Sequence, residues 1–141
     1  MDAFKYKENK LHCEDVNLSK IASSFGTPAY VYSKKALTEN ALMYGNSFTK
    51  PDNMACFSVK SLSNLSVLKL LKDVGCGFDV VSGGEMHRAL SIGADPKRII
   101  FSGVGKSSDE IKQGILNKIL SFNVESVSEL YKIEALSLIH I

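Results

Sequence analysis

The sequence predicts an α/β protein in which parallel strands alternate with helices through most of a chain of 141 residues. Two observations predict this fold class. Short apolar runs typical of strands recur at intervals of about 20 residues, and each is followed by a stretch with apolar residues at helical spacing. Strands that alternate with helices of this length are typical of βα units, whose strands form a parallel sheet.

The elements follow one another in a regular order from residue 34 onward. Ser33 precedes the first helical stretch and is expected to cap it. Gly75 and Gly93 end two of the later helices, as glycine commonly does. The expected helices cover residues 34–48, 64–75, 84–93, 108–117 and 127–135, and the expected strands cover residues 54–59, 77–82, 98–103 and 118–126.

Three of these helices are expected to begin with a capping box, in which a serine and a glutamate three residues later each bind the other's backbone N–H. The pairs are Ser82 with Glu85, Ser107 with Glu110, and Ser126 with Glu129. Each box marks a point at which a strand has ended and a helix begins. The polar residues near these junctions are therefore expected to share one end of the sheet.

Lys60, Asp79, Ser102 and Asn123 fall at the carboxyl ends of the four expected strands. In α/β folds this end of the sheet is where ligand-binding and catalytic side chains collect. Lys60 is notable because an ammonium group at the mouth of an apolar strand is costly to bury. Its side chain either snorkels to the surface or acts as a partly desolvated nucleophile that forms an imine.

The first part of the chain, residues 1–33, does not follow the repeating pattern and is expected to form a different structural layer. Residues 11–26 predict a short strand, a turn and an amphipathic helix. The segment TPAYVYS, residues 27–33, predicts a strand that starts at a proline. Within it, Tyr30 and Tyr32 alternate as buried strand residues do.

Composition excludes several functional classes. Apolar residues make up 45% of the chain and the formal net charge is +2, so the chain should bury a core and a nucleic-acid partner is not expected. No apolar stretch is long enough to span a bilayer, and no secretory signal is expected. Three scattered cysteines, Cys13, Cys56 and Cys76, favour the cytoplasm over a disulfide framework, and without a CxxC pair no metal site is expected.

Five ordered blocks give the chain a specific resemblance over roughly residues 11 to 135. They are PAYVYS, SVKSLSNLSVLKLL, GFDVVSGGE, ADPKRIIFSGVGKS and FNVES. In this order and at this spacing they resemble the diaminopimelate decarboxylase family, whose members are pyridoxal-phosphate decarboxylases built on an alanine-racemase-like barrel. That resemblance implies an eight-stranded βα barrel followed by a β domain, to which the amino-terminal segment also contributes.

The resemblance implies that this chain is the first third or so of a longer enzyme. Four βα units would form the first half of a (β/α)8 TIM-type barrel, which takes about 250 residues when complete. Residues 1–33 would belong with the β domain and residues 34–135 would form a partial pyridoxal-phosphate-binding barrel. Residues 136–141, LSLIHI, resemble a translated sequencing adapter and are expected to be a non-native tail.

The resemblance also assigns roles to three residues. Lys60 would bind pyridoxal phosphate covalently, whereas Asp79 and Glu85 would be acids close to the cofactor. Each residue has a structural alternative: Lys60 could snorkel, Asp79 could bind a backbone amide at its strand end, and Glu85 could serve only in its capping box.

The activity implied for the complete enzyme is conversion of meso-2,6-diaminopimelate to L-lysine and CO₂, by a cytoplasmic homodimer. The residues SLSN that follow Lys60 differ from the family's usual sequence at this point, which leaves the substrate preference open. Ornithine, arginine or carboxynorspermidine decarboxylase, a non-catalytic pyridoxal-phosphate-binding barrel, and a cofactor-free lysine-imine aldolase are the alternatives. The chain alone is expected to be inactive and aggregation-prone, because the family's ring-stacking histidine and ring-nitrogen glutamate would lie further along and four units leave an open sheet edge.

Overall fold

The computed structural model describes residues 3–47 and 53–138. The chain divides into two compact units, residues 1–47 and residues 48–141. Each unit is described by itself below. The predicted division at residue 33, the assignment of residues 1–33 to a β domain and the proposed tail remain predictions.

The amino-terminal unit combines a small antiparallel sheet with two helices. Asn17 caps the first helix, since its side chain accepts the Ser19 N–H at 2.8 Å. Ser33 caps the second helix, as predicted, by accepting the Ala36 N–H at 3.0 Å. The elements are β1 (Phe4–Lys7), β2 (Lys10–Cys13), β3 (Val16–Asn17), α1 (Leu18–Phe25) and α2 (Lys34–Asn46), with sheet order β1-β2-β3. The predicted end of the second helix at residue 48 lies outside the described residues.

The prediction of a strand over residues 27–33 is wrong. This segment joins α1 to α2 without regular structure. A strand needs a neighbour for its backbone N–H and C=O groups, and none of the described strands pairs with this segment. Tyr30 is 90% exposed and Tyr32 is 49% exposed, so they are not buried as predicted.

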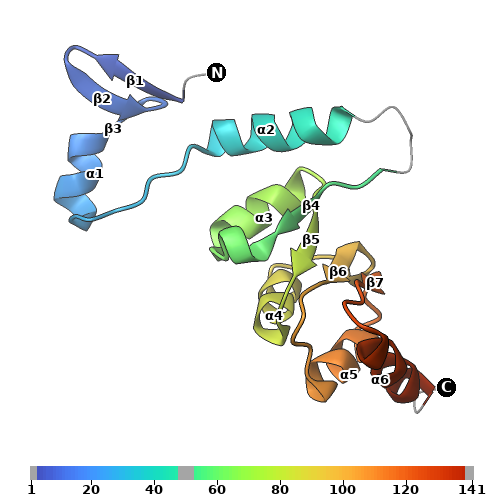
Figure 1. Cartoon of the computed structure of the whole chain (residues 1–141). Coiled ribbons are helices and arrows are strands. Elements are labelled where there is room, and N and C mark those ends of the chain that lie inside the picture. The colour runs from blue at the N-terminus through green and yellow to red at the C-terminus, as the bar shows by residue number, and fades with distance from the viewer. Residues whose placement is uncertain (1–2, 48–52, 139–141) are drawn as a thin grey trace. The chain divides into compact units, whose positions relative to one another are not determined.

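The second unit contains the four predicted βα units. Its strands are all parallel and are hydrogen-bonded in chain order, β4-β5-β6-β7. Figure 1 shows helices α3 to α6 following one another along one side of this sheet. The strands are β4 (Cys56–Ser58), β5 (Gly77–Val80), β6 (Ile99–Phe101) and β7 (Ser121–Phe122), and the helices are α3 (Leu65–Asp73), α4 (Gly83–Ser91), α5 (Ser108–Leu116) and α6 (Val127–Leu138).

The core lies between the sheet and these helices. Alternate strand residues point to opposite faces, and the helix-facing residues of β5 and β6 are fully buried. The core includes Phe78, Val80, Ile99 and Phe101 from the strands and Leu68, Met86 and Ala89 from the helices. The opposite face carries Ser58, Asp79, Ile100 and Ser121, which lie side by side in the register of the sheet.

Two glycines allow close approach of elements in this unit. A Cβ on Gly77 would lie 2.6 Å from the Arg98 carbonyl oxygen and 2.9 Å from Cys56 Sγ. A Cβ on Gly114, in α5, would lie 2.5 Å from the Phe122 ring. Glycine therefore lets β4 meet β5 and lets α5 pack against β7.

Candidate functional site

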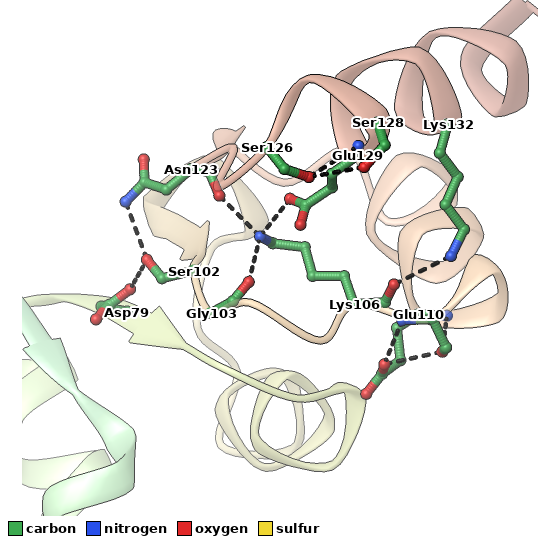
Figure 2. A network of polar contacts seen from close by, with 11 residues as sticks. Asp79, Ser102, Gly103, Lys106, Glu110, Asn123, Ser126, Ser128, Glu129 and Lys132 are labelled. Atoms are coloured by element: carbon green, nitrogen blue, oxygen red, sulfur yellow. Dashed lines mark hydrogen bonds and ion pairs between the residues drawn. The ribbon is translucent and has the colours of Figure 1, made fainter.

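A row of hydrogen bonds joins side chains at the carboxyl ends of all four parallel strands. Ser102 Oγ donates to Asp79 Oδ1, and Asn123 Nδ2 donates to Ser102 Oγ at 2.9 Å. On the other side, Ser58 Oγ donates to Asp79 Oδ2 at 3.3 Å. The prediction that Asp79, Ser102 and Asn123 share one end of the sheet is therefore confirmed, whereas the sequence reasoning missed Ser58 (Figure 2 shows Asp79, Ser102 and Asn123).

The row holds the Asp79 carboxylate without saturating it. An ionised carboxylate offers about four lone-pair positions, and the two serine hydroxyls occupy one on each oxygen. The remaining lone pairs can accept hydrogen bonds from a ligand that binds at this end of the sheet. Asp79 is half-buried, so a ligand could still reach it.

Lys60 lies beside this row of strand ends but not on a strand. It occupies a short 3₁₀ turn, Val59–Ser61, that directly follows β4. Val59 turns into the core and is fully buried, whereas the Lys60 side chain is exposed. The prediction that Lys60 ends the first strand is therefore corrected, because β4 ends at Ser58 and Lys60 lies in the turn that follows. Its partial desolvation in the mouth of a complete barrel remains a prediction.

The amine of Lys60 is unengaged. It makes no hydrogen bond or ion pair with the described residues, Asp79 and Glu85 included. A free ammonium group needs only to lose a proton to attack a carbonyl carbon. Lys60 is therefore available to form a covalent bond with an aldehyde.

Glu85 and Glu110 hold the turn that follows β5. Glu85 accepts the Val81 N–H at 2.9 Å, and Ser82 Oγ accepts the Glu85 N–H at 3.2 Å. The predicted reciprocal box with Ser82 is therefore wrong, because the Glu85 carboxylate binds one residue further back. Glu110 accepts the Gly83 N–H at 2.8 Å.

Of the three predicted capping boxes, the one at α5 is fully formed. Ser107 Oγ accepts the Glu110 N–H, and the Glu110 carboxylate accepts the Ser107 N–H at 2.9 Å. The Gly83 N–H and then the Ser107 N–H lower the pKa of Glu110 below its usual value, because both stabilise the ionised carboxylate. This carboxylate therefore joins the start of α5 to the start of α4.

A buried ion pair lies next to the Asn123 end of the row. Lys106 Nζ lies 2.7 Å from Glu129 Oε1, with the lysine side chain 0% exposed and the glutamate side chain 8% exposed. Lys106 also donates to the Gly103 and Asn123 carbonyl oxygens, each at 2.7 Å (Figure 2). All three N–H donors of the ammonium group are thus used.

The third predicted capping box is also wrong, because Glu129 takes part in this ion pair. Ser126 Oγ does accept the Glu129 N–H at 3.2 Å, but the carboxylate points to Lys106 instead of returning to Ser126. The two charged residues are 23 positions apart. A separation of that size gives no local pattern from which the sequence could have revealed the pair.

Other chemistry-bearing residues do not form a site in the described part of the chain. Burial raises the pKa values of the Cys56 and Cys76 thiols, which keeps them protonated and weakly nucleophilic. No group of three or more His, Cys, Asp or Glu residues that could hold a metal ion occurs in the described ranges. Among the helices described, none is both long and apolar enough to cross a membrane.

Four parallel βα units in chain order, with polar side chains gathered at the carboxyl ends of the strands, are the arrangement found in part of a (β/α)8 barrel. Residues 34–138 match the family described as pyridoxal-dependent decarboxylase, pyridoxal binding domain. The chain belongs to this family.

Relatives and solved structures agree with this assignment. The diaminopimelate decarboxylase of Haemophilus influenzae is 44% identical over 137 residues, which are 97% of this chain and 33% of that protein. The crystal structure of diaminopimelate decarboxylase from M. jannaschii in co-complex with L-lysine has a TM-score of 0.88 at 32% identity, over 96% of this chain and 32% of that chain. Ornithine decarboxylase from Entamoeba histolytica gives 0.64 at 28% identity, over 72% of this chain and 30% of that chain.

This chain thus spans about a third of the length of the curated relatives that it matches. The resemblance inferred from the five sequence blocks and the partial-barrel fold class are both confirmed.

Proposed function

We propose that this chain is the pyridoxal-phosphate-binding portion of a diaminopimelate decarboxylase. In the complete protein it would help to convert meso-2,6-diaminopimelate to L-lysine and CO₂. The observation that carries the proposal is the unengaged Lys60 amine, which follows the first strand of the matched domain and lies at the same sheet end as Asp79.

The described residues fit pyridoxal phosphate chemically. Lys60 offers a free amine to the cofactor's aldehyde. Asp79 offers unoccupied carboxylate lone pairs, and Glu85 has one carboxylate oxygen, Oε1, without a hydrogen bond to the described residues. When bound, pyridoxal phosphate supplies an electron sink for the carbon that loses CO₂.

The protein's own residues would bind and orient the cofactor. Lys60 would fix it at the end of β4, and Asp79 would place a negative charge beside it. Glu85 would place a second carboxylate close to the cofactor. It lies in the first turn of α4, where it accepts a hydrogen bond from the Val81 N–H. Because the chain spans about a third of its relatives, the phosphate-binding, ring-stacking and substrate-binding groups are assigned to the rest of the complete protein.

Diaminopimelate is favoured over ornithine or arginine because the solved diaminopimelate decarboxylases are more similar to this chain, in identity and TM-score, than the solved ornithine and arginine decarboxylases. Solved diaminopimelate decarboxylases also bind L-lysine, the expected product. We further propose that the complete protein is a homodimer in the cytoplasm. The isolated 141-residue chain should show no decarboxylase activity, and detectable turnover by the purified chain would contradict this.

Labelling of the complete gene product that contains this chain tests the proposal. Borohydride reduction in the presence of pyridoxal phosphate should leave a pyridoxyl group on Lys60, found by peptide mapping. Lys60→Ala should abolish both this label and the visible absorption of the bound cofactor. Lys97→Ala is the matched control, because Lys97 is another exposed lysine of the same unit.

The same protein should release CO₂ from meso-2,6-diaminopimelate. If ornithine or arginine is turned over faster than meso-2,6-diaminopimelate, the proposed substrate is wrong, whereas the proposed cofactor still stands. An unlabelled Lys60 in a protein that binds the cofactor would reject the site.

A further inference from the structure

The row of hydrogen bonds at the strand ends does not stop at Asn123. The backbone N–H of Asn123 donates to the Phe101 carbonyl oxygen at 2.9 Å, and its C=O accepts from Lys106 Nζ at 2.7 Å. Lys106 is fixed in turn by Glu129. Asn123 is thus held on both sides of its Cα, which fixes the direction in which its side chain leaves the backbone (Figure 2).

The row has a defined direction. The Ser102 hydroxyl has a single hydrogen, which goes to the acceptor-only carboxylate of Asp79. Ser102 Oγ must then accept from Asn123, so the amide group presents its Nδ2 rather than its oxygen. Each group in the row therefore determines the orientation of the next, from Asn123 to Ser102 to Asp79.

Burial does not require the Asn123 side chain to make this bond. Asn123 is exposed, so water could satisfy its amide at little cost, and a hydrogen bond of this kind adds little net stability. The main effect of the bond is on Ser102, and through Ser102 on the Asp79 carboxylate. This distinguishes Asn123 from Lys106 and Glu129, whose burial alone demands that they be paired.

We propose that Ser102 and Asn123 are positioning residues for Asp79, and that the buried Lys106–Glu129 pair fixes Asn123 for this role. The inference rests on the proposed function, because it takes Asp79 as a carboxylate that faces the bound cofactor. The ion pair then has two effects. It joins α6 to the loop after β6, and it sets the geometry of a carboxylate two strands away.

The test uses the complete gene product and two measurements. The first is the Kd for pyridoxal phosphate, from visible absorbance during titration of the apo protein. The second is kcat and KM for meso-2,6-diaminopimelate. Ser102→Ala removes a hydrogen bond to the Asp79 carboxylate and should raise the cofactor Kd and lower kcat by about 10-fold. Asn123→Ala removes a bond between neutral groups and should change both in the same direction by about 3-fold. KM should change by less than about 2-fold in both variants.

Matched controls remove an asparagine and a serine whose hydrogen bonds are purely local. Asn117→Ala, at the residue that caps the end of α5, loses a side-chain bond only to the Gln113 carbonyl oxygen, and Ser91→Ala loses one only to the Arg88 carbonyl oxygen in α4. They should leave Kd and kcat unchanged. The Tm of the apo protein should be similar in all four single variants, which separates positioning from stability.

A double variant tests whether the row acts in series. If Asn123 acts only through Ser102, then Asn123→Ala combined with Ser102→Ala should be no worse than Ser102→Ala alone. Multiplied effects on the cofactor Kd would overturn the series arrangement.

The remaining outcomes separate this inference from the proposed function. If Asp79→Ala weakens cofactor binding but Asn123→Ala does not, the positioning inference is overturned while the proposed function stands. If Asp79→Ala has no effect, there is no carboxylate to position and the inference is again overturned, even though Lys60 is labelled.

Glu129→Gln tests the part assigned to the ion pair. This variant should raise the cofactor Kd, measured below its Tm. A lowered Tm with an unchanged Kd would make the pair structural only. If this variant does not fold, Asn123→Ala still decides the question, because it leaves the ion pair in place.

Discussion

The two compact units of this chain are held together in different ways. In the second unit, strand and helix residues form one core that includes seven of the eight largest fully buried side chains among the described residues. In the first unit, neither helix has a buried residue. Polar contacts take the place of a core there: Glu14 accepts from Ser33 Oγ at 2.7 Å and from the Lys35 N–H at 3.0 Å.

This difference shows which part of the chain can hold a site rigidly. Side chains packed in a core resist displacement, whereas exposed hydrogen bonds open readily. The candidate site lies on the unit with the core, at the ends of strands whose other face is buried. Amino-terminal residues held mainly by polar contacts should be the first to exchange their amide hydrogens.

The largest effect is expected from breaking the buried ion pair of the second unit. Lys106→Met leaves Glu129 buried without a partner, which should lower the free energy of unfolding by about 3–5 kcal/mol. Urea denaturation of the complete protein measures this. Lys112→Met removes an exposed lysine whose pair with Asp109 spans 3.9 Å, and it should change stability by less than about 1 kcal/mol. Equal effects of the two variants would contradict the assigned difference in burial.

A helix glycine in each unit gives a second comparison, with effects of opposite sign. Gly114→Ala places a Cβ 2.5 Å from the Phe122 ring, and this overpacking should destabilise the protein by about 1–3 kcal/mol. The midpoint of urea unfolding should therefore fall. A midpoint equal to that of the unmodified protein would show that α5 and β7 can separate without cost.

Gly45→Ala is the counterpart in the first unit. A Cβ on Gly45, in α2, would meet nothing within 4 Å. Alanine should then stabilise α2 by up to about 1 kcal/mol through its higher helix propensity. Slower amide exchange in α2 would be the expected sign, and faster exchange would mean that this helix needs the glycine.

The smallest effect is expected from acid. Hydrogen bonds from Ser33 and from the Lys35 N–H lower the pKa of Glu14, and those from Gly83 and Ser107 lower the pKa of Glu110. A carboxyl with a lowered folded-state pKa stabilises the fold above its unfolded value, near 4.5, and loses this contribution as the pH falls through the folded value.

The protection factors of the Lys35 and Gly83 amides should therefore fall as the pH drops below about 4.5, more than that of an amide hydrogen-bonded only to backbone. Glu110→Gln should remove the extra loss of protection at Gly83 and leave that at Lys35 in place. If Gly83 in this variant still responds to acid as before, Glu110 is not the group responsible.

The sequence predicted the repeating unit well because period and helix caps are local signals. The four βα units and the shared end of Asp79, Ser102 and Asn123 follow from strand length, helix spacing and Ser-x-x-Glu patterns. Resemblance to a family supplied the closed barrel and the cofactor, which periodicity alone could not.

The errors arose where contacts between distant residues decide the structure. Residues 27–33 have strand-like composition, but a strand forms only beside a partner, which no local pattern reveals. Glu85 and Glu129 have capping-box spacing, yet their carboxylates bind Val81 and Lys106 instead. The position of Lys60 just beyond the strand likewise depends on a single turn after β4.

The close approach at Gly77 restricts how this protein can vary. The Arg98 carbonyl oxygen and Cys56 Sγ occupy the space that any side chain there would need. Even alanine should therefore not be tolerated at this position, because its Cβ would overlap these two atoms. Asp79 lies two residues further along the same strand. Its position in the sheet therefore depends on the absence of a side chain at Gly77.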